Sequence, residues 1–373
     1  MATTFRRPAA ADPAAAADPA APADPAAPAD LAQTVVAWYP TAARNLPWRQ
    51  PGAGPWAVLV SEVMLQQTPV PRVLPVYTAW LQRWPTPRAL AADQPGEAIR
   101  AWGRLGYPRR ALRLHAAARL IDCEHAGQVP DDPAALRALP GVGVYTAAAV
   151  AAFAFGRRHP VLDTNVARLL TRVFGDDTRT TDGRLRQRLD RLLPADPALA
   201  ALVSVALMEL GALVCTARGP ACGRCPLRRS CQSAGRPPAQ GGGPRRAGGA
   251  GAAGAAGAAG GAGGAGAAGA AGAAGGAGAA GAAGAAGPVP PAAPAAPLTL
   301  RQHASPRRRP RYHGSVREAR GLLLAAVRVA PGPVDAQTLA RACPDSARRA
   351  SALSGLLDDG LLRALADGTY TLP

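Results

Sequence analysis

Apolar residues recur with a spacing near 3.6 between residues 31 and 235, which is typical of helices that bury one face. The segments with this spacing cover 31–39, 56–67, 73–84, 97–105, 111–121, 132–139, 145–155, 166–174 and 202–214, and they end at Pro, Gly or Asp. Only the stretch 159–162 has extended character, and it is too short to form a sheet. The pattern therefore predicts an all-α domain over 31–235.

Residues 312–373 show a different order of elements. Helical spacing covers 317–329, 335–343 and 347–360, and alternating residues then surround Asp367-Gly368, which is a hairpin signal. Three helices followed by a hairpin predict a small winged-helix-like domain. Domains of this kind bind either DNA or other proteins, and the pattern leaves both open.

Two segments lack the composition of a packed domain. Proline recurs every few residues in the Ala/Pro/Asp-rich segment 1–30, which prevents a periodic helix. Residues 236–300 consist almost entirely of Gly, Ala and Pro without the strict register of collagen, and basic residues follow up to 311. We expect 1–30 to be a disordered tail and 236–311 a disordered linker.

Charge narrows the class of partner. The net charge is +18, and all 42 basic residues are arginine, so a polyanion is the expected partner and no lysine is available for a Schiff base. No apolar run approaches 18 residues and the N-terminus lacks a secretory core, so neither a membrane span nor a membrane partner is expected. We expect a cytoplasmic, nucleoid-associated protein.

Four of the six cysteines lie close together in one loop, 215–231. Their spacing is C-x6-C-x2-C-x5-C, formed by Cys215, Cys222, Cys225 and Cys231. Four thiolates in so short a loop can surround one metal centre, and the spacing suits either zinc or an iron–sulfur cluster. The same loop carries Arg218, Arg224, Arg228 and Arg229, which would present positive charge to phosphates.

The stretch "LPGVGVYTAAAV" predicts a glycine turn that opens into a helix. Gly141 and Gly143 allow backbone amides to face outward at a helix N-terminus, where anions bind favourably. Leu136, Leu139 and Val144 would hold the two flanking helices together. This pattern indicates a helix-hairpin-helix that grips phosphate without reading sequence, although an ordinary helix–helix connection has a similar pattern.

Two carboxylates are candidates for chemistry. Glu62 is the only acidic residue between Asp30 and Asp93, and a helix over 56–67 would place it among Val58, Leu59 and Leu65. A carboxyl on an apolar face has a raised pKa and can donate a proton. Asp163 lies where an extended segment turns into a helix, so it can cap that helix and also serve an active site.

Taken together, six motifs resemble the MutY-type adenine DNA glycosylases of the helix-hairpin-helix superfamily, which include an endonuclease III-like branch. They are "LPWR", "SEVMLQQT", "LGYPRRA", "LPGVGVYTA", "VLDTNV" and the four-cysteine loop, in this order within 31–235. The resemblance implies a base-excision-repair enzyme that removes adenine mispaired with 8-oxoguanine or guanine in double-stranded DNA. It also implies that the loop binds a 4Fe-4S cluster, and we expect a monomer.

The resemblance also assigns roles to residues. It implies that Glu62 protonates the flipped adenine, that Asp163 stabilises the cationic sugar, and that Asn165 positions the nucleophile or the carboxylate. The residues assigned to the DNA are Trp48 and Arg49 in the adenine pocket, Gln67 and Tyr107 in the base stack, Thr68 near the opposing lesion, and Gly141 and Gly143 at the phosphates.

Tyr145 decides the expected outcome of the reaction. The endonuclease III branch has a lysine at this place that attacks the sugar and leads to strand cleavage, whereas a tyrosine cannot form an imine. We therefore predict base removal without efficient strand cleavage.

Some features depart from the family pattern. Pro108 and Thr164 stand where relatives often carry tyrosine and glycine, and 236–373 offers no β-rich Nudix-like domain. The alternatives are a thymine or uracil mismatch glycosylase and a non-catalytic iron–sulfur protein that binds DNA.

Overall fold

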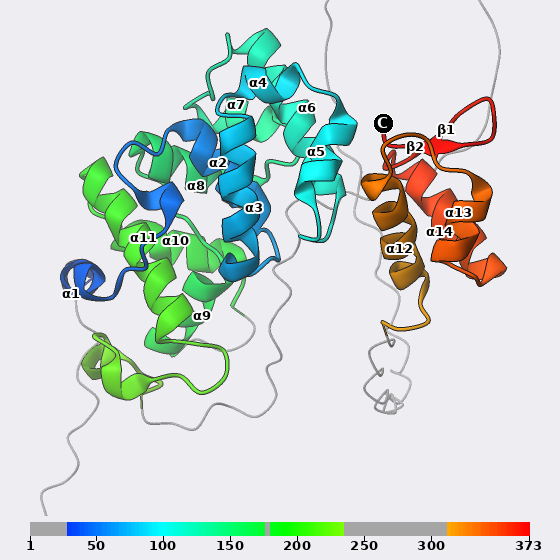
Figure 1. Ribbon diagram of the computed structural model, residues 1–373. Helices are drawn as coiled ribbons and strands as arrows, with labels where there is room; N and C mark the ends of the chain where they lie inside the picture. Colours follow the sequence, from blue (N-terminus) through cyan, green and yellow to red (C-terminus); the bar gives the residue numbers. More distant parts are fainter. Residues whose placement is uncertain (1–27, 176–179, 235–311) are drawn as a thin grey trace, which may run out of the picture. The chain divides into compact units, whose positions relative to one another are not determined.

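The computed structural model describes residues 28–175, 180–234 and 312–373. The first two ranges form a helical domain with no strand among their described residues, so the all-α prediction is confirmed. Its helices are α1 Pro28–Ala42, α2 Pro55–Leu65, α3 Val70–Arg83, α4 Pro87–Ala91, α5 Pro95–Trp102, α6 Arg109–Glu124, α7 Pro133–Ala138, α8 Val144–Phe155, α9 Thr164–Val173, α10 Asp182–Leu192 and α11 Pro197–Leu213 (Figure 1).

All nine helical segments predicted in this domain are present, and two short or highly charged helices were missed. α4 has five residues, too few to show a period, and α10 has leucines as its only apolar residues among arginines and aspartates. The helix starts follow simple capping chemistry. The side chains of Asp132, Asp163, Thr181 and Asp196 each accept a hydrogen bond from the third residue of the helix that follows.

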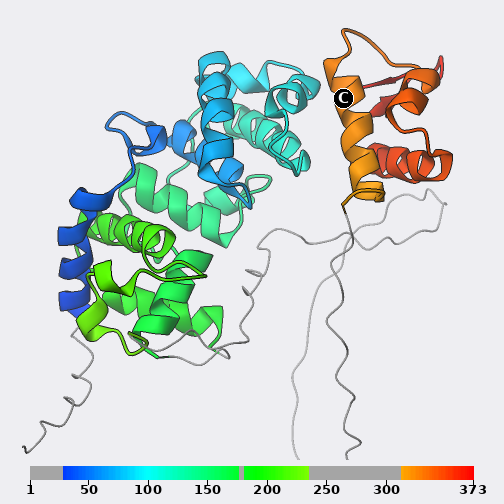
Figure 2. The same ribbon diagram turned by 60° about the horizontal axis from the view of Figure 1, so that its bottom comes forward.

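The helical domain has two main cores. One consists of side chains between Leu46 and Ala151, from α2 to α8, and the other joins α1 to α9, α10, α11 and the cysteine loop. α2 packs against α8 and α3, while α1 packs against α11, as both ribbon views show (Figures 1 and 2). A small third cluster around Ala149, Ala152 and Val161 lies where α8 meets α11, and Tyr145 packs against it.

Residues 312–373 contain α12 Val316–Val329, α13 Ala336–Ala342, α14 Ser346–Asp358 and a two-stranded antiparallel hairpin, β1 Arg363–Ala364 and β2 Tyr370–Thr371. The predicted order of three helices and a hairpin is confirmed, and Gly368 turns the hairpin with a φ of +79°. Val334 also bridges to Tyr370, which the sequence did not reveal. The assignment to a winged-helix domain stays a prediction.

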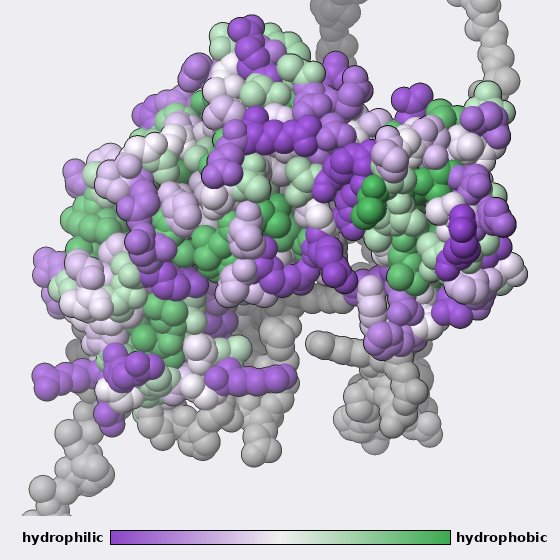
Figure 3. All heavy atoms as spheres, in the orientation of Figure 1, coloured by the Kyte–Doolittle hydropathy of each residue, from purple (hydrophilic) through white to green (hydrophobic). Residues whose placement is uncertain are grey.

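Charge is divided unevenly along the chain. Residues 31–235 contain 25 arginines and 14 acidic residues, whereas 312–373 contain seven arginines and six acidic residues. Hydrophilic side chains cover much of the face seen in Figure 3, between smaller apolar areas. The predicted linker 236–311 and most of the predicted tail lie outside the described residues, although α1 already begins at Pro28. Within the described ranges, no helix is long and apolar enough to cross a membrane.

Candidate active site

Glu62 lies inside the apolar helix α2 and is almost fully buried, with 6% of its surface exposed. Its predicted neighbours Val58 and Leu59 are buried beside it. Burial raises the pKa of Glu62 to about 7, helped by the negative charge of Asp163 and opposed by a hydrogen bond from Tyr145 and the positive charge of Arg49. A carboxyl with this pKa is protonated in a large fraction of molecules at neutral pH, so it can act as an acid.

Asp163 is both a helix cap and a partner of this site. One carboxylate oxygen accepts a hydrogen bond from the Val166 amide at 2.7 Å, and the other accepts one from the Asn165 side chain at 2.7 Å. Burial raises the pKa of Asp163, and these hydrogen bonds oppose the rise. The two roles considered for Asp163 therefore occur together, because the cap fixes the carboxylate close enough to Glu62 for their charges to interact.

Tyr145, in the first turn of α8, donates its hydroxyl to Glu62. Burial, together with the charges of Glu62 and Asp163, raises the pKa of Tyr145 well above its usual value, so the phenol keeps its proton. The structure thus brings together Glu62 from α2, Tyr145 from α8 and Asp163 from the start of α9, as predicted from three separate motifs.

Glu209 in α11 belongs to the same region and was missed by the sequence analysis. It is completely buried, and its carboxylate accepts hydrogen bonds from Arg44 Nε at 2.6 Å and from Arg49 Nη1 at 2.9 Å. Burial opposes ionisation, but these two arginines hold the pKa of Glu209 at about 2. Glu209 therefore fixes Arg49 beside Glu62. The sequence pattern that could have revealed Glu209 is the one already used for Glu62, a single acidic residue within an apolar helix.

A chain of hydrogen bonds connects Asp163 to the cysteine loop. Asn165 binds Asp163 and accepts from Arg168 at 2.8 Å, and Arg168 also donates to the backbone oxygen of Cys215 at 2.8 Å. Gly211 of α11 allows this close packing, because a Cβ there would lie 2.8 Å from the backbone oxygen of Asn165. The position of the catalytic candidate Asp163 thus depends on the packing of the loop.

The residues predicted to contact DNA divide into exposed and buried groups. Gln67 and Tyr107 are exposed, and both have left-handed backbones, with φ of +57° and +49°. Trp48 is buried and its ring meets that of Tyr77 edge to face at 5.1 Å. Thr68 is buried and accepts a hydrogen bond from Arg110 at 2.8 Å. Their roles toward DNA stay predictions.

Comparison with known proteins places this arrangement in a family. Residues 60–195 match the model of the HhH-GPD superfamily base excision DNA repair protein. An adenine DNA glycosylase of Mycobacterium tuberculosis is 40% identical over 344 residues, which cover 91% of this chain and 92% of the relative. The chain belongs to the adenine DNA glycosylases.

Two further comparisons support the glycosylase fold of the helical domain. The human adenine DNA glycosylase is 40% identical over 210 residues, which cover 54% of this chain and 38% of the human protein. A solved structure of a thermostable thymine-DNA glycosylase is 26% identical, covers 55% of this chain and 95% of its own, and aligns with a TM-score of 0.52.

In this adenine glycosylase, the two glycines of the predicted turn have different backbone conformations. Gly141 has a φ of +85°, which strains any other residue, and a Cβ there would also be crowded by Arg113 Cβ at 3.0 Å. Gly143 caps α8 with extended backbone, which other residues can also adopt. Leu136 and Leu139 are buried as expected, but Val144 is 40% exposed, so the expectation that it holds the flanking helices together was wrong.

The four loop cysteines are all free thiols that come near one another. Cys215 is buried and the other three are half-buried. Burial, together with negative charge on Cys215, Cys231 and Cys222, raises the pKa of Cys225 to about 11. Within the described residues, no three His, Cys, Asp or Glu side chains gather as one metal ion requires. Four thiols in one loop are a donor set that suits either zinc or an iron–sulfur cluster, and the cluster stays a prediction.

The outer face of the cysteine loop carries exposed charge. Its exposed arginines are Arg218, Arg224, Arg228 and Arg229, in agreement with the basic loop expected from the sequence. From α9, Arg172 donates to the sulfur of Cys215 at 3.4 Å. A buried thiolate in this place would therefore have a positive partner.

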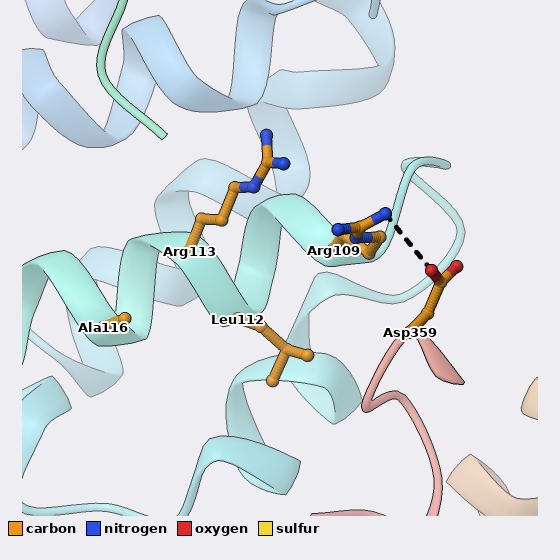
Figure 4. Close-up of a pocket in the computed structure, with 5 residues that line it drawn as sticks. All are labelled: Arg109, Leu112, Arg113, Ala116 and Asp359. Carbon is orange, nitrogen blue, oxygen red and sulfur yellow. Dashed lines mark hydrogen bonds and ion pairs between the residues drawn. The ribbon is translucent and has the colours of Figure 1, made fainter. Parts of the chain in front are cut away.

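A pocket at the surface of α6 is separate from these residues (Figure 4). It is lined by Arg109, Leu112, Arg113 and Ala116 of α6 and by Asp359, which pairs with Arg109 at 3.2 Å. None of the predicted catalytic residues contributes to it.

Proposed function

We propose that this protein removes adenine mispaired with 8-oxoguanine or guanine in double-stranded DNA, and that it does not cut the strand. The observation that carries the proposal is the buried Glu62, which has a pKa of about 7 and lies close enough to Asp163 for the two charges to interact. The names of two relatives that are each 40% identical support adenine as the base. The basic helical domain, with 25 arginines against 14 acidic residues, supports DNA as the partner.

The reaction follows from the two carboxyl groups. Glu62 gives its proton to the flipped adenine, the bond between the base and the sugar C1′ breaks, and the electron pair leaves with the base. The sugar then carries positive charge, which the Asp163 carboxylate stabilises while Asn165 holds that carboxylate in place. A water adds its oxygen to C1′ and returns a proton to Glu62, which restores the acid.

Tyr145 and the absence of lysine support hydrolysis alone. Tyr145 is protonated and hydrogen-bonded to Glu62, so it orients the acid and does not attack the sugar. No lysine exists anywhere in the 373 residues to form an imine. The expected product is therefore an intact strand with an abasic site.

We further propose that Cys215, Cys222, Cys225 and Cys231 hold a 4Fe-4S cluster. The cluster would supply a fixed scaffold for the loop. The chain's own residues then present Arg218, Arg224, Arg228 and Arg229 to phosphates and hold Asp163 through Arg168 and Asn165.

Single-turnover assays on matched duplexes test this function. Duplexes that carry A:8-oxoG, A:G, A:C, T:G or U:G at one position are incubated with excess protein, and half of each sample is then treated with alkali. We expect release of adenine from the A:8-oxoG and A:G duplexes, with strand breaks only after alkali. Release of thymine or uracil without adenine would establish the alternative substrate, and breaks before alkali would contradict the role of Tyr145.

A further inference from the structure

Arg110 is a buried arginine without an acidic partner. It is the second residue of α6 and is 6% exposed, and no ion pair joins it to a carboxylate within the described part of the chain. Burial lowers the pKa of Arg110 to about 10, so it still carries its charge at neutral pH. Burying a charge costs free energy, so the groups that Arg110 contacts must stabilise it.

The guanidinium of Arg110 binds two separate turns. One nitrogen donates to the backbone oxygens of Val63, Met64 and Gln66, at 2.9, 2.9 and 2.6 Å, which are the last carbonyls of α2 and its cap. The other nitrogen donates to the Thr68 hydroxyl and to the Gly106 oxygen at 3.1 Å. Carbonyls at the end of a helix lack partners within it and carry partial negative charge, so a cation suits them.

Each of these turns carries a strained, exposed residue directly after a carbonyl that Arg110 binds. Gln67 follows Gln66, and Tyr107 follows Gly106. They are two of the three non-glycine residues with positive φ in the described chain, Ala126 being the third. The guanidinium also lies 5.6 Å from the ring centre of Tyr107. Such backbone conformations persist only where surrounding contacts impose them.

We infer that Arg110 is a positioning residue that locks both turns in one arrangement, so that Gln67 and Tyr107 enter the DNA together when adenine leaves the stack. The inference rests on the proposed function, because it assigns both side chains to the vacated stack. Lysine could not replace this arginine, because an ammonium group cannot span five acceptors on two turns with the geometry of a planar fork.

The test compares Arg110→Lys with a matched arginine elsewhere in the full chain. Arg158 also binds several carbonyls, Pro194 at 2.9 Å and Leu193 at 3.3 Å, together with Asp190, but it is far in sequence from both turns. Arg158→Lys therefore controls for the general cost of losing an arginine that holds a turn.

Two readouts separate positioning from folding. Single-turnover excision is measured for adenine opposite guanine, and for adenine opposite an abasic site, where no partner base must be separated. Extrusion itself is followed by the fluorescence of 2-aminopurine at the target position. We expect Arg110→Lys to slow excision from the A:G duplex about tenfold, or about 1.4 kcal/mol in activation free energy, and to weaken the fluorescence rise. Excision opposite the abasic site should change much less.

The outcomes distinguish the two proposals. If the unaltered protein releases no adenine from either duplex, the proposed function fails. If it does, and Arg110→Lys slows both duplexes equally or leaves the fluorescence rise unchanged, the positioning role is wrong.

Discussion

Glu62 and Glu209 show that neighbouring charges and hydrogen bonds, and not burial alone, set the pKa of a carboxyl group. Glu62 and Glu209 both lie in apolar helices and are buried, yet their pKa values are about 7 and about 2. Glu209 faces Arg44 and Arg49 directly, whereas Glu62 receives only a phenol hydrogen bond and a more distant positive charge. The sequence predicted Glu62 from its apolar neighbours. It did not reveal Glu209, whose arginines are more than 150 residues away in the chain.

The raised pKa of Glu62 has a consequence for stability. The folded pKa of about 7 lies above the ordinary value of 4.5, so the folded protein loses stability as pH rises through this window. A shift of this size corresponds to about 3 kcal/mol when fully expressed. Glu62→Gln removes this titration. As pH rises from 5 to 8, the free energy of unfolding of the variant should therefore increase by about 2 kcal/mol relative to that of the unaltered protein. Urea unfolding at both pH values measures this change. If the variant and the unaltered protein differ in stability by the same amount at pH 5 and at pH 8, the raised pKa of Glu62 is contradicted.

At the scale of elements, the periodic helices were predictable and the contacts between them were not. Each long amphipathic segment became a helix, because one apolar face is enough to specify it. The short α4 and the charged α10 gave too little apolar pattern, and Val144 lies on an exposed face although it follows the glycine turn. The link from Asp163 through Asn165 and Arg168 to Cys215 depends on how α9 packs against α11, which no local pattern encodes.

The cysteine loop permits a prediction that does not depend on activity. Cys222→Ser should remove iron and the brown colour from the purified protein, because the proposed cluster would lose one of its four ligands. Cys123→Ser is the matched control, because Cys123 is exposed on α6 and outside the loop, and it should retain the iron. Metal analysis of both proteins measures the effect. Stoichiometric zinc in the unaltered protein would overturn the cluster assignment.

At the scale of the whole molecule, short motifs were enough to indicate the family, and the distribution of charge indicates which parts of the chain bind DNA. Six short motifs within 31–235 were sufficient to indicate an adenine glycosylase, and the 40% identity over 91% of the chain confirms it. The helical segment 31–235 has 25 arginines and 14 acidic residues, the predicted linker 236–311 has eight arginines and no acidic residue, and 312–373 is nearly balanced. This distribution favours the first two segments as the phosphate-binding parts and leaves the C-terminal elements open to a protein partner.

The pH dependence of single-turnover adenine excision tests the central claim most directly. Because Glu62 must be protonated to act as the acid, the rate on an A:8-oxoG duplex should fall as pH rises through about 7, and it should fall again at low pH as Asp163 takes up a proton. Glu62→Gln should abolish excision at every pH while the DNA is still bound. A rate that stays level from pH 6 to pH 9, or near-normal turnover by Glu62→Gln, would contradict the account.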